Sequence, residues 1–274
     1  MRPVLDDFEI ELPLLLEAVY RKYHHDFRSY SLASLRRRLT QALNDLRIDS
    51  LSQLQDRVLR DAVVFARLLQ YLTVQVSEMF RDPLYFRAIR EQVVPVLHTY
   101  PSIKVWVAGC STGEEVWSLA ILLEEEGLAD RTLLYATDIN PDALRIAQSA
   151  VYGLDRVDGF SQNYLAAGGK RALSDYYYAA YGGASFARSL RTQVMFADHS
   201  LATDSVFSEV HLVSCRNVLI YFNRELQDRA IGLMKDSLVR RGFMGLGSKE
   251  SLRFCAHVDA FTDVDANQRV FQKR

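Results

Sequence analysis

The chain lacks the features that mark several classes of protein. Its 274 residues include three cysteines, Cys110, Cys215 and Cys255, which are scattered and form no CxxC or CxxH pattern. Such sparse cysteines argue against a disulfide framework and a cysteine-based metal site, and we expect no metal. The apolar run at 12–19 is too short to cross a bilayer, and acidic residues precede it where a signal peptide would be apolar. We therefore expect a soluble protein of the reducing cytoplasm.

An excess of charge of either sign is also missing. The chain has 33 Lys and Arg against 34 Asp and Glu, for a formal net charge of −1. Affinity for phosphate backbones and anionic lipid comes from clustered basic residues, so this balance supplies no global attraction to either. We expect no nucleic-acid partner and no direct membrane insertion. A partner that binds through charge must meet a local patch.

Glycine is absent from residues 5–76, where the only interior proline is Pro13. Leucines recur there at helical spacing, most clearly over 32–46, where Ser31 is a plausible N-cap. We expect residues 1–76 to form a helical N-terminal domain, followed by a hinge or linker over 77–102.

Arginines cluster on the helix expected over 32–46. Arg37 points away from its leucine stripe, with Arg36 and Arg38 beside it. Two interpretations stay open, a solvated helix face and a docking surface for an acidic partner.

From residue 103 onward, short β-branched or aromatic runs alternate with amphipathic helical segments. This alternation predicts an α/β domain over 103–274 with a mostly parallel sheet and helices on both faces. The expected strands are 103–108, 132–137, 193–196, 211–215 and 242–246. We expect a helix over 224–241, capped by Asn223 and ended by Gly242. The glycine- and tyrosine-rich stretch at about 155–191 is too long for a bare loop, and we expect some helix and a small antiparallel insertion there.

The segment 105–115 is an apolar strand that leads through a glycine-bearing turn into a helix. Gly109 and Gly113 are spaced G-x-x-x-G, whereas a dinucleotide site needs G-x-G-x-x-G. Glu114 and Glu115 stand at the helix start, where they would repel a pyrophosphate. This pattern favours a cationic or zwitterionic ligand such as S-adenosylmethionine over a nicotinamide cofactor. The alternative is a tight turn without a ligand.

Polar residues follow other expected strands at the same edge of the sheet. Asp138 ends one strand, where it can accept both hydroxyls of a ribose or simply cap the strand. Arg216 and Asn217 follow another, and Tyr221 lies shortly after them. Upstream, Arg81 is either a functional cation or a partner of the neighbouring Asp82. A crevice position would give the Tyr221 hydroxyl a partner, and the alternative is an aromatic packed in the interior.

Four segments together resemble the chemoreceptor glutamate methyltransferases of the CheR type. They are Ser77-Glu78-Met79-Phe80-Arg81-Asp82, Ala108-Gly109-Cys110-Ser111-Thr112-Gly113-Glu114-Glu115, Ala136-Thr137-Asp138-Ile139-Asn140 and Ser214-Cys215-Arg216-Asn217-Val218-Leu219-Ile220-Tyr221-Phe222. The resemblance covers nearly the whole chain. It implies a Rossmann-like S-adenosylmethionine-dependent methyltransferase sheet with an N-terminal all-helical domain and a small antiparallel β insertion.

The resemblance also implies roles for individual residues. Arg81 would orient the substrate carboxylate and Tyr221 would lie beside the transferring methyl. Residues implied to bind the cofactor are Gln75, Ser77, Arg81, Gly109, Glu115, Asp138, Ser200, Leu201, Arg216 and Asn217. Ser200 stands where asparagine is common in the family.

The implied activity is methyl transfer from S-adenosyl-L-methionine to glutamate side chains of chemoreceptors, with S-adenosyl-L-homocysteine as the product. The partner would be the cytoplasmic helical bundle of a membrane chemoreceptor, met by Arg36, Arg37 and Arg38, and we expect a monomer. Two alternatives stay open, a carboxyl methyltransferase of a non-receptor protein and a catalytically silent regulatory module that binds the cofactor.

Overall fold

The computed structural model describes residues 6–274, and its chain divides into two compact units. The first five residues, part of the segment used to argue against a signal peptide, lie outside this range. The first unit holds the chain up to Val74 together with Tyr221–Gln227, and the second holds Gln75–Ile220 and Asp228–Arg274. None of the helices among residues 6–274 combines the length and apolar character needed to cross a membrane.

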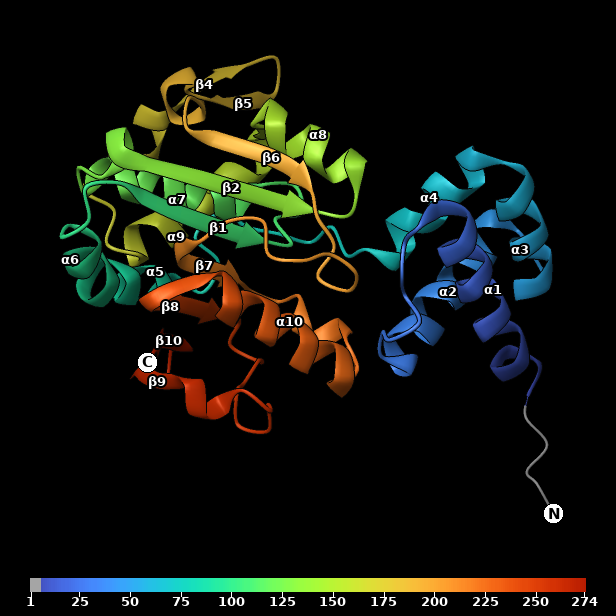
Figure 1. Ribbon diagram of the computed structural model, residues 1–274. Helices are drawn as coiled ribbons and strands as arrows, with labels where there is room; N and C mark the ends of the chain where they lie inside the picture. The colour runs from blue at the N-terminus through green and yellow to red at the C-terminus, as the bar shows by residue number, and fades with distance from the viewer. Residues whose placement is uncertain (1–5) are drawn as a thin grey trace. The chain divides into compact units, whose positions relative to one another are not determined.

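The first unit is built from helices, as the absence of glycine predicts. They are α1 (Asp7–Tyr23), α2 (Leu32–Leu46), α3 (Leu51–Arg60) and α4 (Ala62–Leu72) (Figure 1). Side-chain caps start three of them, at Asp6, Ser50 and Asp61. Ser31 occupies the N-cap position of α2, but its side chain makes no capping hydrogen bond.

A short segment from far along the chain completes this unit. The amide of Ser31 donates to the carbonyl of Tyr221 at 2.8 Å, and the amide of Asn223 donates to the carbonyl of Ser29 at 2.9 Å. The rings of Tyr30 and Phe222 pack edge to face, with centroids 5.0 Å apart. Phe222 is buried. Residues 221–227 are therefore an integral part of the helical unit.

The second unit is organised around a seven-stranded sheet in the order β6-β2-β1-β7-β8-β10-β9. Its strands are β1 (Ile103–Ala108), β2 (Thr132–Asp138), β6 (Val194–Asp198), β7 (Val210–Cys215), β8 (Leu238–Leu246), β9 (Phe261–Asp265) and β10 (Val270–Lys273). The pairs from β6 to β8 are parallel, whereas β10 runs antiparallel to both of its neighbours. Figure 1 shows the arrowheads of β6, β2 and β1 at one edge of the sheet, so their carboxyl ends share that edge.

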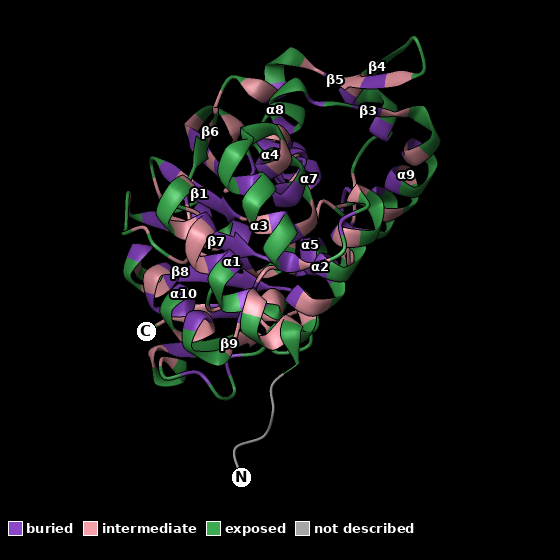
Figure 2. Ribbon diagram, turned by 90° about the vertical axis from the view of Figure 1, so that its right-hand side faces the viewer, coloured by how far each residue is buried: buried purple, intermediate pink, exposed green. Residues whose placement is uncertain are grey.

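Helices pack on this sheet and form much of the chain that connects its strands. They are α5 (Pro83–Ala88), the π-helical turn η1 (Ile89–Val93), α6 (Val94–Leu97), α7 (Glu114–Glu125), α8 (Pro141–Ser149), α9 (Val157–Ala166) and α10 (Arg224–Ser237), whose first residues are grouped with the helical unit. Single 3₁₀ turns are η2 (Ala129–Arg131), η3 (Leu154–Arg156), η4 (Leu173–Tyr176), η5 (Arg188–Arg191), η6 (Leu219–Tyr221) and η7 (Val258–Ala260). Figure 2 shows β1 and β7 buried, with much of α9 exposed on its outer side.

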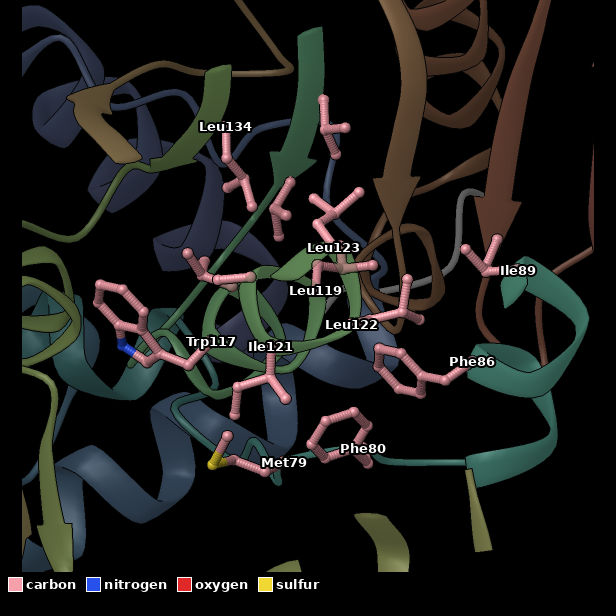
Figure 3. Packing of buried hydrophobic residues seen from close by; sticks show 14 of the residues in the cluster. Met79, Phe80, Phe86, Ile89, Trp117, Leu119, Ile121, Leu122, Leu123 and Leu134 are labelled. Carbon is pink, nitrogen blue, oxygen red and sulfur yellow. The ribbon is translucent and has the colours of Figure 1, made fainter. Parts of the chain in front are cut away.

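The hydrophobic core of the second unit is packed around α7. Figure 3 shows Met79, Phe80 and Phe86 beside this helix, whose Trp117 and Ile121 are fully buried. Residues 77–102, which we expected to form a linker, instead carry α5, η1 and α6 and belong to the second unit. Their apolar side chains explain this placement, because burial against α7 removes them from water.

A second, three-stranded antiparallel sheet confirms the predicted small insertion. Its order is β3-β5-β4, with β3 at Val151–Gly153, β4 at Tyr177–Ala180 and β5 at Gly183–Phe186. The helix α9 lies within the same insertion.

The helix expected over 224–241 is wrong at its carboxyl end. It ends at Ser237, and β8 begins at the next residue. Gly242 therefore lies inside a strand, where an added Cβ would come within 2.9 Å of the carbonyl oxygen of Val239. The glycine fits an irregular stretch of strand rather than a helix stop, because pairing of β8 with β7 shifts register between Val210 and Leu212.

Candidate active site

The turn between β1 and α7 is closely packed around two glycines. Gly109 and Gly113 have φ values of +72° and +91°, which favour glycine. A Cβ at Gly109 would lie 2.5 Å from a methyl of Val218, and one at Gly113 would lie 2.7 Å from the Cβ of Ala147. The amides of Gly109 and Cys110 both donate to the carbonyl of Thr137, which joins the turn to the end of β2. Neither glycine can carry a side chain without displacing its neighbours.

Glu115 is held near the start of α7 by groups from β7 and the residue after it. Its carboxylate accepts a hydrogen bond from Ser214 Oγ at 2.6 Å and an ion-paired one from Arg216 Nη1 at 3.0 Å. The single hydroxyl proton of Ser214 is used in the bond to Glu115. The hydroxyl of Tyr85 is therefore the donor in its 2.8 Å hydrogen bond to Ser214 Oγ. The Glu115 carboxylate is thereby fixed in orientation, and it keeps lone pairs that can accept from a ligand.

Asp138 stands at the carboxyl end of β2, as the sequence indicated. One of its oxygens accepts from the amide of Ser111 at 2.8 Å and the other from the amide of Asn140 at 2.9 Å. Burial raises the pKa of Asp138, and the facing charge of Asp198 on β6 adds to this, against the lowering effect of the amide donors. Each carboxylate oxygen has further acceptor capacity, which suits a pair of hydroxyls.

Arg216 is buried and binds other protein groups. Its Nη2 donates to Asp82 at 2.8 Å and to the carbonyl of Arg81 at 2.9 Å, while Nη1 reaches Glu115. Its guanidinium lies over the ring of Tyr85, 4.2 Å from the centroid. The interpretation that Arg81 pairs with Asp82 is therefore wrong, because Asp82 pairs with Arg216. Arg216 thus connects Glu115, near the start of α7, to the backbone at Arg81 and the side chain of Asp82.

Asn217 adopts a left-handed backbone conformation, with φ +60°. Its amide donates to a carboxylate oxygen of Glu250 at 3.0 Å, and the amides of Gly247 and Ile220 donate to the same carboxylate. Burial raises the pKa of Glu250, while these amides act to lower it. Glu250 thus holds the backbone of residues 217–220, a role that no local sequence pattern indicated.

The segment 75–82 lies along the glycine turn and α7. Ser111 Oγ donates to Gln75 Oε1 at 3.0 Å, and the amide of Phe80 donates to Ser118 Oγ at 2.8 Å. Phe80 and Asp82 have φ values of +52° and +54°, which cost energy in residues other than glycine. Such strain at a fixed turn is typical of functional segments.

Arg81 lies between these two strained residues. Among residues 6–274, no carboxylate comes within ion-pairing distance of its guanidinium, although its carbonyl is held by Arg216. The structure thus presents a half-buried arginine whose charge has no acidic partner in the described chain.

Ser200 and Leu201 follow β6, the strand that neighbours β2. Leu201 is buried. The amide of Ser200 donates to Asp204 at 2.9 Å, and its hydroxyl accepts from the amide of Ala202 at 3.2 Å. The short Ser200 side chain is thus engaged in its own turn, and its predicted cofactor contact stays a prediction.

Tyr221 and the arginines of α2 belong to the helical unit. Arg36 pairs with Asp6 at 3.1 Å and Arg37 is exposed. Arg38 is only 5% exposed, donates to the carbonyl of Leu72, and lies over the ring of Tyr221, 4.2 Å from its centroid. Its predicted place on a docking face is therefore wrong. The guanidinium is drawn inward by the carbonyl and the ring, and burial lowers its pKa.

Family models match almost the whole chain. Residues 75–270 match the model described as CheR methyltransferase, SAM binding domain, and residues 10–73 match the CheR methyltransferase, all-alpha domain. The chain belongs to the CheR methyltransferase family. The resemblance read from the sequence is confirmed, and so is the fold that it implied.

Individual relatives agree with this assignment. A protein of Pseudomonas putida with the provisional name methyltransferase Cher3 is 58% identical over 97% of each chain. The chemotaxis protein methyltransferase of Listeria monocytogenes is 26% identical, over 91% of this chain and 93% of its own. Chemotaxis protein methyltransferase 2 of Pseudomonas aeruginosa is 28% identical over 81% and 79%.

S-Adenosyl-L-methionine is the cofactor of this CheR domain, and the site residues fit it. Gly109 and Gly113 form a sharp turn between β1 and α7, where Val218 and Ala147 leave no room for side chains. Glu115 and Asp138 supply fixed carboxylates with spare acceptor capacity, which suits an ammonium group and ribose hydroxyls. Sequence reasoning missed the supporting residues Tyr85, Ser214 and Glu250, because their contacts join segments far apart in the chain.

Proposed function

We propose that this CheR-family methyltransferase is a protein-glutamate O-methyltransferase that acts on chemoreceptors. The observation that carries the proposal is Arg81, whose backbone carbonyl is held by Arg216 and whose guanidinium has no acidic partner among residues 6–274. Such a cation suits an incoming carboxylate. The names of the Listeria and P. aeruginosa relatives support a role in chemotaxis.

The chemistry asks little of the protein beyond positioning. When bound, S-adenosyl-L-methionine supplies a sulfonium methyl, whose transfer to a carboxylate oxygen breaks the carbon–sulfur bond and leaves S-adenosyl-L-homocysteine. A glutamate side chain is already ionised at neutral pH, so no general base is needed. In this proposal Arg81 orients the carboxylate, and Glu115 and Asp138 hold the amino group and the ribose. Alignment of the reactants and exclusion of water then provide the rate enhancement.

The proposed partner is the cytoplasmic helical bundle of a receptor. The exposed Arg37 and the half-exposed Arg36 on α2 remain suited to an acidic helical surface. Arg36 is already engaged by Asp6, so Arg37 is the arginine of this patch that we expect to contribute most to receptor affinity.

Labelled S-adenosyl-L-methionine and receptor-containing membranes test the proposal. We expect label in the receptor fraction that is released by alkali, because methyl esters hydrolyse in base. Alkali-stable label would exclude an ester, and alkali-labile label in another protein would support the non-receptor alternative. Cofactor binding without any transfer would support a catalytically silent module.

The role of Arg81 is tested by Arg81→Ala. We expect turnover to fall about 100-fold or more, while affinity for S-adenosyl-L-homocysteine changes less, because Glu115, Asp138 and the other cofactor-binding residues remain when Arg81 loses its contact to the substrate carboxylate. Arg87→Ala is the matched control, since Arg87 is an exposed arginine on the neighbouring α5. Unchanged turnover in Arg81→Ala would refute this role.

A further inference from the structure

Arg156 reaches from the insertion to two parts of the candidate active site. It is the last residue of η3, directly after β3. Its Nη1 pairs with Glu114 Oε1 at 2.8 Å, and its Nη2 donates to the carbonyl of Ser77. One guanidinium thus joins the first residue of α7 to the segment that carries Gln75, Ser77 and Arg81.

The Glu114 end of this contact is fully buried. Glu114 has no exposed surface, and besides Arg156 its carboxylate accepts from Thr112 Oγ1 at 2.6 Å. A carboxylate removed from water is costly unless a cation and hydrogen-bond donors compensate it. Arg156 supplies the cation, although its own side chain is 37% exposed.

Aromatic residues of the insertion fix the guanidinium in place. Its central carbon lies 4.9 Å from the ring centroid of Phe160 and 5.9 Å from that of Tyr152. The hydroxyl of Tyr152 donates to the carbonyl of Thr112 at 2.7 Å. The insertion therefore contacts both sides of Gly113, through Tyr152 at Thr112 and through Arg156 at Glu114.

We propose that Arg156 is a positioning residue that sets the segment 75–82 against the glycine turn. The bond between Ser111 and Gln75 fixes one end of this segment, and Arg216 fixes the other at Arg81 and Asp82. Arg156 fixes Ser77 between them, so the placement of Arg81 depends on the insertion. This inference rests on the proposed role of the segment in binding the cofactor and orienting the substrate.

Arg156→Lys separates this role from a purely structural one. A lysine ammonium still neutralises Glu114, but it lacks the planar fork that reaches the Ser77 carbonyl at the same time. We expect a melting temperature close to that of the natural chain, together with about tenfold weaker binding of S-adenosyl-L-homocysteine by calorimetry. Arg188→Lys, at an exposed arginine of the same insertion, should change neither quantity.

A second variant separates an effect on binding from a loss of stability. Arg156→Ala leaves Glu114 charged and unpaired, so we expect it to lower the melting temperature, and Glu114→Gln in the same chain should restore it. The restored double variant should still bind S-adenosyl-L-homocysteine weakly, because the Ser77 carbonyl still lacks its hydrogen bond from Arg156. Natural affinity in both Arg156→Lys and the double variant would overturn the proposal. Failure of receptor methylation alone would count against the proposed function and not against Arg156, since this binding needs no receptor.

Discussion

Left-handed backbone conformations gather in the segments that form the candidate site. Gly109 and Gly113 adopt them, and so do Ser111, Asn217 and Phe80, which have side chains. The sequence predicted the bend at the glycines, because glycine in a strand-to-helix turn has few other purposes. It did not predict the bends at the other three, since tertiary hydrogen bonds to distant residues hold them.

Substitution of Gly113 tests how closely this turn is packed. In Gly113→Ala the new methyl would meet the Cα and Cβ of Ala147, at 2.8 and 2.7 Å, as well as an unfavourable φ. We expect a loss of about 3 kcal/mol or more in the free energy of unfolding, measured by urea titration. Gly127→Ala is the matched control, because Gly127 also has positive φ but nothing within 4 Å of an added Cβ. Equal losses in the two variants would contradict the packing argument.

Several residues of the site could be predicted from their place at strand ends. Asp138, Arg216 and Asn217 are of this kind, because Asp138 ends β2 and the other two follow β7, whereas Glu115 was marked by its place at the start of a helix. Arg38, Arg156 and Glu250 could not be placed in this way. Each has a side chain whose partner lies in a distant segment, and local spacing says nothing about such partners.

At the scale of elements, a buried ionic cluster joins η1, the end of α7 and the insertion. Arg90 pairs with Glu125 and Glu126, and Glu125 also accepts from the hydroxyl of Tyr164 and the amide of Lys170. Burial raises the pKa of Glu125, but these donors outweigh it, so the pKa lies below the usual 4.5. Burial and the bond to Glu125 raise the pKa of Tyr164 to about 12.

This cluster predicts a dependence of stability on pH. Because the folded pKa of Glu125 is lowered, its stabilising contribution is complete above pH 4.5 and is lost as the pH falls through the folded value. We expect Glu125→Gln to lose about 1–3 kcal/mol of unfolding free energy at pH 7 and progressively less below pH 4.5. Glu124→Gln, one residue earlier on α7, is the control. A deficit that stays constant with pH would contradict this assignment.

The strand and helix pattern of the second unit was largely predictable, because buried strands and capped helices have strong local signals. Asn140, followed by Pro141, is such a cap, and its side chain accepts from the amides of Asp142 and Ala143 at the start of α8. The boundary between α10 and β8 was not predictable. Residues 233–241 contain no glycine or proline that would mark the boundary, and the strand is recognised there by the pairing of Leu238 with Val210 of β7.

At the scale of the whole molecule, the helical unit is discontinuous in sequence. Composition suggested a simple N-terminal block, because the absence of glycine and the leucine spacing both stop near residue 76. The contribution of Tyr221–Gln227 carries no such signal. Its pairing with Ser29 and Ser31 is long-range, and it became evident only from the fold.

Phe222→Ala tests how much residues 221–227 contribute to the stability of the helical unit. Phe222 is 5% exposed and packs on Tyr30, so truncation of its side chain to alanine should lower the free energy of unfolding by about 3–5 kcal/mol. We expect faster amide hydrogen exchange in α2 and α4, with the strands β1 and β2 of the other unit little affected, as measured by mass spectrometry. Ile220→Ala, at a more exposed neighbour, is the control. Equal protection of α2 in Phe222→Ala and the natural chain would contradict the assignment.

The discontinuous helical unit also bears on synthesis by the ribosome. About 150 residues separate Val74 from Gln227, and at about 5–20 residues per second their translation takes roughly 8–30 s. Throughout that interval α1 to α4 have emerged without the segment that supplies Phe222. The helical unit is therefore completed only after the strands β1, β2, β6 and β7 have been translated, and until then the ring of Tyr30 lacks the Phe222 ring that packs on it.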